Sequence, residues 1–161
     1  MFLKKIIKTN KKLIDTAITL HKSGKIRPDS YVVDVDQFLD NAKKILETAK
    51  AEKIHLYFML KQMGRNPYLA KELIKLGYEG AVTVDFKEAE LMIQHGIPLG
   101  NVGHLVQIPE AEIDRIVSYG SKVITVYSLD KIKSIDKVAK KYGIQQDLLL
   151  RVFEDGDVVY S

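Results

Sequence analysis

Lys61 combines a reactive side chain with a position in the chain where catalysis is common. It follows the apolar run 54–60 and precedes the polar segment 62–67, which contains glycine and proline. A lysine that ends a buried strand lies where open α/β sheets and α/β barrels keep their chemistry. Its amine is therefore a candidate nucleophile, and a solvated lysine at a strand end is the competing interpretation.

Other polar side chains are expected at the same edge of the sheet. His104 follows Gly103 at the end of an apolar run, where a structural histidine in a turn is the alternative. Arg151 follows three leucines in a predicted strand, so its charge needs a partner or an anion at a barrel mouth. Tyr127 and Ser128 close another predicted strand and are candidates for the same rim, although Ser128 is equally a candidate helix cap.

A unit of apolar run, polar turn and glycine-terminated helix repeats from residue 54 onward. The predicted strands are 54–60, 80–84, 102–106, 123–127 and 148–152. The predicted helices are 67–76, 86–95, 109–119 and 129–142, with Pro67 and Pro109 at first helical positions. Continuous apolar strands that alternate with amphipathic helices predict a parallel sheet covered by helices.

Two architectures fit this repeat. Length favours a five-stranded doubly wound sheet, because an eight-stranded barrel needs about 250 residues. The end of the chain favours the barrel, because no covering helix is predicted after the last strand, between residue 153 and Ser161. An exposed parallel edge is normally covered by a partner or by further sequence.

The first 30 residues are expected to form a helix, 1–24, and a linker, while 31–161 form the main domain. Asp36 is the predicted cap of a helix over 37–51. Asp34 and Asp36 make a poor metal site, because hard cations require several convergent oxygens. We therefore predict no metal.

Composition excludes several classes of function. The 161 residues contain no cysteine, which excludes disulfides, cysteine-bound zinc and thiol catalysis and favours a cytoplasmic location. The net charge of +4 is concentrated before Lys25, where interleaved apolar residues favour an amphipathic helix over nucleic-acid binding. No apolar stretch is long enough for a membrane span, and no phosphate-binding glycine motif occurs.

These parts together resemble the N-terminal region of the alanine racemase family of fold-type III pyridoxal 5′-phosphate enzymes. In that family an x-Asp-x-Asp strand, here residues 33–36, and a helix with an early Asn, here Asn41, precede the first barrel strand. The lysine that ends this strand, here Lys61, forms the Schiff base. Residues 69–77, 80–84 and 88–89 resemble the second βα unit of the family. The segments 61–67 and 101–106 look closer to an uncharacterised branch of alanine-racemase-like proteins than to alanine racemase itself.

The resemblance implies a TIM-type barrel, of which residues 31–161 would be a truncated N-terminal portion with about five of eight strands. It implies pyridoxal 5′-phosphate as cofactor and Lys61 as the catalytic Schiff-base residue. Arg65, His104 and Arg151 are then candidate cofactor-binding residues. Arg65 departs from the family, because it stands where a tyrosine usually helps to hold the phosphate.

The implied function is a racemase-like enzyme acting on an amino acid or amine, with decarboxylation as a second possible reaction. A non-enzymatic pyridoxal-phosphate-binding protein of the same barrel type is one alternative, and an inactive truncated product is another. The expected partners are a small-molecule substrate and further copies of the chain in a homo-oligomer, without nucleic acid or membrane.

Overall fold

The computed structural model describes residues 2–154 and 156, which fall into two compact units. The first unit comprises residues 1–44 and the second residues 45–161. The first contains α1 (Phe2–Thr9) and α2 (Lys11–Lys22), and α3 (Val35–Ala51) crosses the boundary. The domain boundary predicted between residues 30 and 31 stays a prediction.

Asn10 divides the N-terminal region into two helices, so the single helix predicted over 1–24 is wrong. Its side-chain oxygen accepts a hydrogen bond from the Leu13 amide at 3.0 Å and thereby caps α2. Its amide nitrogen donates to Asp34 Oδ2 at 2.6 Å. An asparagine that satisfies a free amide of the next helix favours a new start over a continuous helix.

Asp34, rather than the predicted Asp36, caps α3. Its Oδ1 accepts a hydrogen bond from the Gln37 amide at 3.0 Å. That bond and the one from Asn10 hold the pKa of Asp34 below its ordinary value. The x-Asp-x-Asp segment therefore starts a helix here, and residues 31–34 form no strand.

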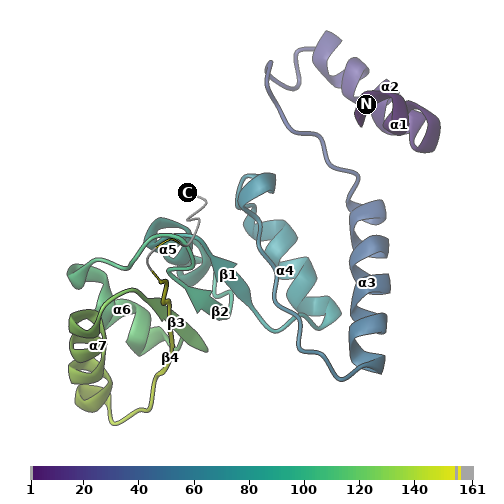
Figure 1. The fold of residues 1–161 in the computed structure, drawn as a ribbon. Coiled ribbons are helices and arrows are strands. Elements are labelled where there is room, and N and C mark those ends of the chain that lie inside the picture. The colour runs from purple at the N-terminus through teal and green to yellow at the C-terminus, as the bar shows by residue number, and fades with distance from the viewer. Residues whose placement is uncertain (1, 155, 157–161) are drawn as a thin grey trace. The chain divides into compact units, whose positions relative to one another are not determined.

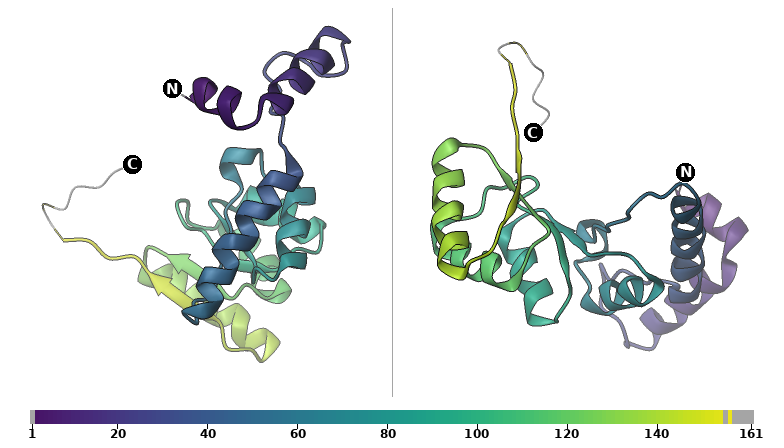
Figure 2. Two further views of the ribbon diagram at one scale, coloured as in Figure 1. Left: turned by 90° about the vertical axis from the view of Figure 1, so that its right-hand side faces the viewer. Right: turned by 90° about the horizontal axis from the view of Figure 1, so that it is seen from below.

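The second unit is built on a parallel sheet with the order β1-β2-β3-β4 (Figures 1 and 2). Its strands are β1 (Ala81–Thr83), β2 (Leu99–Val102), β3 (Val123–Val126) and β4 (Asp147–Leu150). The helices between or before them are α4 (Pro67–Leu76), α5 (Phe86–Gln94), α6 (Glu110–Tyr119) and α7 (Leu129–Tyr142). The predicted α/β fold of parallel βα units is confirmed.

The first predicted strand, 54–60, is reduced to a single bridge between Phe58 and Ala81. The Phe58 amide donates to Gly80 O at 3.0 Å, and the Val82 amide donates to Phe58 O at 2.7 Å. The first predicted strand is thus a bridge-forming segment beside β1. Because this segment and the four strands follow one another in chain order, the sheet lacks the reversal that defines a doubly wound fold.

The strand predicted over 102–106 is wrong in its bounds. The observed strand β2 is Leu99–Val102, so it ends at the residue where the predicted strand was to begin. Gly103 has φ +82°, outside the strand region, and an added Cβ would lie 3.1 Å from Thr125 O. The chain then turns back, and the amides of Leu105 and Val106 donate to Val84 O. The residues after β2 therefore form a loop at the carboxyl edge of the sheet.

Helices α4 and α7 have the predicted bounds. Asn66 caps α4 by accepting a hydrogen bond from the Tyr68 amide at 2.9 Å, and Gly77 ends it in a left-handed conformation. Pro109 is the cap of α6 rather than its first residue.

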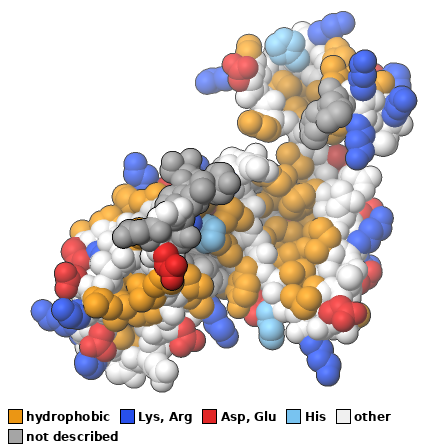
Figure 3. Space-filling view, viewed as in Figure 1, with side chains coloured by type: hydrophobic (Ala, Val, Ile, Leu, Met, Phe, Trp, Pro, Cys, Tyr) orange, Lys and Arg blue, Asp and Glu red, His pale blue; other side chains and the backbone are white. Residues whose placement is uncertain are grey.

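The core of the second unit lies between the sheet and its helices. Helix α5 packs on β1 and β2, and α6 packs against α5 and α7. The fully buried side chains come from both layers and include Met92, Val102, Ile113, Ile124 and Ile135. Hydrophobic side chains also remain at the surface (Figure 3), among them Leu149 and Leu150 of β4, which are 49% and 43% exposed. The sequence predicts no covering helix between residue 153 and Ser161, and most of these residues lie outside the part that the structure describes.

Two carboxylates on α6 are held by lysines of α7. Lys131 is buried and donates to Glu110 at 2.5 Å, and Lys141 donates to Asp114 at 2.5 Å. The hydrogen bonds from these lysines lower the pKa of Glu110 and of Asp114. A carboxylate with a lowered folded-state pKa stabilises the fold above its unfolded pKa, and this stability is lost as the pH falls through the folded pKa.

We expect the free energy of unfolding to fall as the pH drops below 4.5, the ordinary value for Glu110, and further below 3.8, the ordinary value for Asp114. Urea unfolding at neutral pH and below 3.8 measures this loss. Asp114→Asn should reduce the acid-dependent part of the free energy of unfolding, because this carboxylate accepts hydrogen bonds from Lys141 and Tyr142 of α7. Asp136→Asn, which removes a carboxylate paired within α7, is the matched control. An equal loss in both variants would contradict the assignment.

Tyr57 packs on Gly100 and thereby links the bridge-forming segment to β2. A Cβ on Gly100 would lie 2.1 Å from Tyr57 Cδ1 and 2.7 Å from Cε1. We expect Gly100→Ala to destabilise the protein by about 2 kcal/mol, because the ring must leave its place. In a Tyr57→Ala background the same change should cost much less, and a double-mutant cycle in urea measures the difference. Additive effects would show that the ring is not the obstacle.

Candidate functional site

Lys61 begins a tight turn that leads away from the bridge at Phe58. The turn opens as the 3₁₀ helix η1 (Lys61–Met63), directly after the buried Leu60. Leu60 O accepts hydrogen bonds from the amides of Met63 at 2.9 Å and Arg65 at 3.0 Å. Buried Leu60 and these two bonds fix the start of the turn, while the side chain of Lys61 is exposed.

The four predicted site residues all lie in segments that follow strand ends. Because the strands are parallel, these segments meet at one edge, the carboxyl edge of the sheet. Lys61 and Arg65 follow the bridge-forming segment, His104 follows β2 and Arg151 follows β4. The structure therefore places them along one edge, with Lys61 and Arg151 at its two ends.

His104, Tyr127 and Arg151 form a connected cluster. The Tyr127 hydroxyl donates to His104 O at 2.8 Å and to Gly103 O at 3.2 Å. Arg151 Nη1 donates to His104 O at 3.5 Å, and its guanidinium lies 5.8 Å from the centre of the Tyr127 ring. The side chains of His104 and Arg151 remain exposed, so they are accessible to a ligand at this edge.

Arg65 lies close to two carboxylates. Its Nη2 is 3.9 Å from Asp85 Oδ2, and its Nε is 3.7 Å from Glu88 Oε2. Neither Asp85 nor Glu88 is among the site residues predicted from the sequence. Their Asp-x-x-Glu spacing resembles a capping box and so marks the start of α5, but it does not point to Arg65 as a partner.

A polar pair crosses the sheet behind this edge. Thr125 of β3 is 1% exposed, and its hydroxyl donates to Asn101 Oδ1 of β2 at 2.8 Å. Thr83 of β1 is also buried and donates to Asn101 O at 3.3 Å. These residues stand in otherwise apolar strands, and nothing in the sequence pattern marks them as partners.

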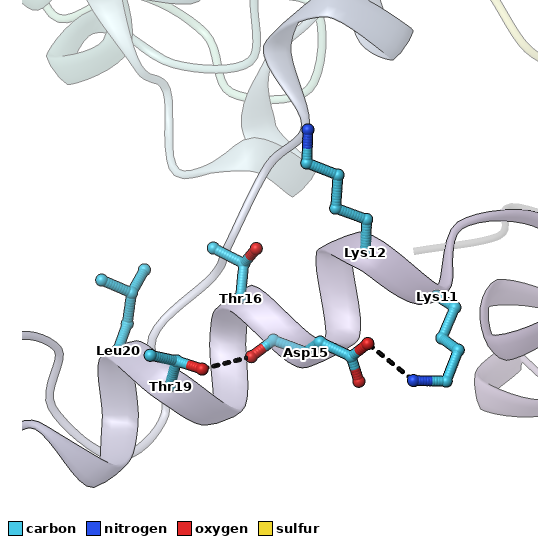
Figure 4. Close-up of a pocket in the computed structure, with 6 residues that line it drawn as sticks. All are labelled: Lys11, Lys12, Asp15, Thr16, Thr19 and Leu20. Atoms are coloured by element: carbon cyan, nitrogen blue, oxygen red, sulfur yellow. Dashed lines mark hydrogen bonds and ion pairs between the residues drawn. The ribbon is translucent and has the colours of Figure 1, made fainter.

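A cavity of about 470 Å³ in the first unit contains none of the predicted site residues. The cavity is lined by residues of α2. Among them, the Lys11 amine and the Asp15 carboxylate point toward each other (Figure 4). Within residues 2–154, no group of three His, Asp or Glu side chains could hold a metal ion. No described helix is both long and apolar enough to cross a membrane.

Comparison with known proteins supports the same fold. The chain is 48% identical over 160 residues to the "Uncharacterized protein YhfX" of Escherichia coli (strain K12). The matched region covers 99% of this chain and 41% of YhfX. The crystal structure of D-threonine aldolase from Filomicrobium marinum superposes with a TM-score of 0.63 at 20% identity. The superposed region covers 75% of this chain and 33% of the aldolase. Because the identity is only 20%, the likeness concerns the fold alone.

The chain thus spans less than half of the length of either protein. Its parallel βα units correspond to part of a TIM-type barrel, as predicted. The family model "Alanine racemase, N-terminal domain" matches residues 33–154, which include the bridge-forming segment, all four strands and the four candidate residues. The chain therefore belongs to the alanine racemase N-terminal domain family.

Proposed function

We propose that this chain is the N-terminal part of a pyridoxal-phosphate-dependent, racemase-like enzyme in which Lys61 holds the cofactor. The observation that carries the proposal is the place of Lys61 at the carboxyl edge of the sheet. Its amine is exposed, and no hydrogen-bond or ion-pair partner faces it among the described residues. A neighbouring carboxylate would keep such an amine protonated, whereas an amine without that partner can lose its proton and condense with an aldehyde.

The neighbouring residues fit an anionic cofactor. Arg65 lies four residues after Lys61 and is 40% exposed, so a phosphate can reach its guanidinium although two of its nitrogens face carboxylates. His104 and Arg151 offer further donors at the same edge. Guanidinium groups bind phosphate and carboxylate through paired hydrogen bonds. Arg65 would hold the phosphate, and His104 and Arg151 would bind other polar groups of the cofactor.

When bound, pyridoxal phosphate supplies an electron sink that acidifies the Cα–H bond of an amino acid or amine. Lys61 Nζ would then take up or return a proton on one face of the substrate. Racemisation requires a second proton carrier on the opposite face, and decarboxylation requires only one. The substrate, the choice between these reactions and assembly into a homo-oligomer are parts of the proposal that concern the whole protein.

The test uses pyridoxal 5′-phosphate as the probe. The chain is mixed with the probe, a visible absorption band is recorded, borohydride is added, and the modified lysine is identified by peptide mass mapping. We expect the band to disappear on reduction and the label to map to Lys61. Labelling spread over the exposed lysines without preference for Lys61 would contradict the proposal.

A further inference from the structure

A buried carboxylate lies behind the turn that carries Lys61. Glu88, in the first turn of α5, is only 2% exposed, and its Oε2 accepts a hydrogen bond from the Val84 amide at 2.8 Å. The same oxygen lies 3.7 Å from Arg65 Nε. A carboxylate buried to this extent requires a charged or hydrogen-bonding partner. Arg65 is the cation that the structure supplies.

Arg65 reaches this carboxylate from an unusual backbone conformation. Its φ is +54°, in the left-handed region, and Gly64 before it has φ +67°. A residue with a Cβ is strained in this region, so the conformation persists only where other contacts offset the strain. The contacts here are the guanidinium's approach to Asp85 and Glu88 and the hydrogen bond from the Arg65 amide to Leu60 O.

We propose that Glu88 is a positioning residue for Lys61. Its carboxylate joins the Val84 amide, just after β1, to Arg65, at the end of the turn that Lys61 begins. The turn is thereby fixed to the carboxyl edge of the sheet. The geometric part rests on these contacts alone, and the consequence for cofactor capture rests on the proposed function.

Hydrogen exchange tests the geometric part without any cofactor. The amides of Met63 and Arg65 both donate to Leu60 O, so their exchange rates report the closure of the turn. Glu88→Gln keeps the shape and an acceptor for the Val84 amide but removes the charge. We expect it to raise exchange at these two amides by roughly tenfold. The control is Glu90→Gln, which removes a half-exposed carboxylate of the same helix paired with Arg115 at 2.8 Å.

Two results would overturn the proposal. One is that the Met63 and Arg65 amides exchange as fast in Glu90→Gln as in Glu88→Gln. The other is a rise spread evenly over α4, α5 and α7 in Glu88→Gln, because that would show support of the whole fold rather than of the turn. Arg65→Gln should raise the exchange rates of the same two amides. In the double variant with Glu88→Gln, these rates should rise little further.

Covalent labelling then tests the consequence for Lys61. With pyridoxal phosphate and borohydride, Glu88→Gln is expected to label Lys61 several-fold more slowly than the unsubstituted chain, while labelling of the exposed Lys71 on α4 stays the same. An unchanged ratio of Lys61 to Lys71 would refute this consequence. If the unsubstituted chain does not label at Lys61, the proposed function fails, and the exchange rates still decide the role of Glu88.

Discussion

Lys61→Ala is expected to abolish the specific capture of pyridoxal phosphate by this chain. The substitution removes the amine at the edge of the sheet and leaves a methyl group on an exposed residue of a short turn, so the fold should persist. The visible band and the borohydride-stable mass at this position should both be lost. Absorption spectra and peptide maps of the variant and the unsubstituted chain measure the effect.

Two further variants test whether capture needs the amine of Lys61 rather than its positive charge or another exposed lysine. Lys61→Arg keeps the positive charge but provides no neutral amine, because a guanidinium is not deprotonated in proteins, so capture should again be lost. Lys71→Ala removes an exposed lysine of α4 and should leave capture unchanged. Full capture by Lys61→Arg would show that charge alone attracts the probe and that no covalent bond forms at this residue.

Gly80→Ala is expected to destabilise the protein by about 3 kcal/mol. An added Cβ would lie 2.9 Å from Gly100 N and 2.9 Å from Pro98 O. Both obstacles are backbone atoms of the chain entering β2 and within it, so no side chain can rotate to make room. The substitution should force β1 and β2 apart where Gly80 O also accepts the Phe58 amide. Urea unfolding measures the loss.

The control for Gly80 is Gly143→Ala. Gly143 ends α7 with φ +64°, and nothing lies within 4 Å of an added Cβ. Its replacement should cost only the left-handed conformation, about 1 kcal/mol. Equal losses at the two positions would contradict the view that close approach of the backbone explains Gly80.

The sequence predicts elements best where the end signals are local. Helices α4 and α7 have the predicted bounds because Asn66 and Ser128 cap their starts and Gly77 and Gly143 end them. The break at Asn10 was missed because the flanking residues continue an amphipathic pattern. Only the hydrogen bonds that Asn10 makes with Leu13 and Asp34 reveal it.

Strand bounds and site partners depend on contacts between distant segments. The run 102–106 is apolar enough for a strand, yet the chain turns at Gly103 because Val84 O accepts the amides that follow. The edge to which Lys61 and Arg151 belong follows from the βα repeat alone. The partners of Arg65, by contrast, lie on another βα unit, and no spacing within its own segment points to Asp85 or Glu88.

The position of the bridge-forming segment beside β1 sets a length scale for the site. Neighbouring strands lie about 4.8 Å apart, so the row from that segment to β4 measures about 19 Å along the sheet. Lys61 stands at one end of this row and Arg151 at the other. In a closed eight-stranded barrel the first and fifth strands face each other across the interior. Contact of Arg151 with a molecule held at Lys61 therefore requires the sheet to curve, so that the two side chains converge over the barrel mouth.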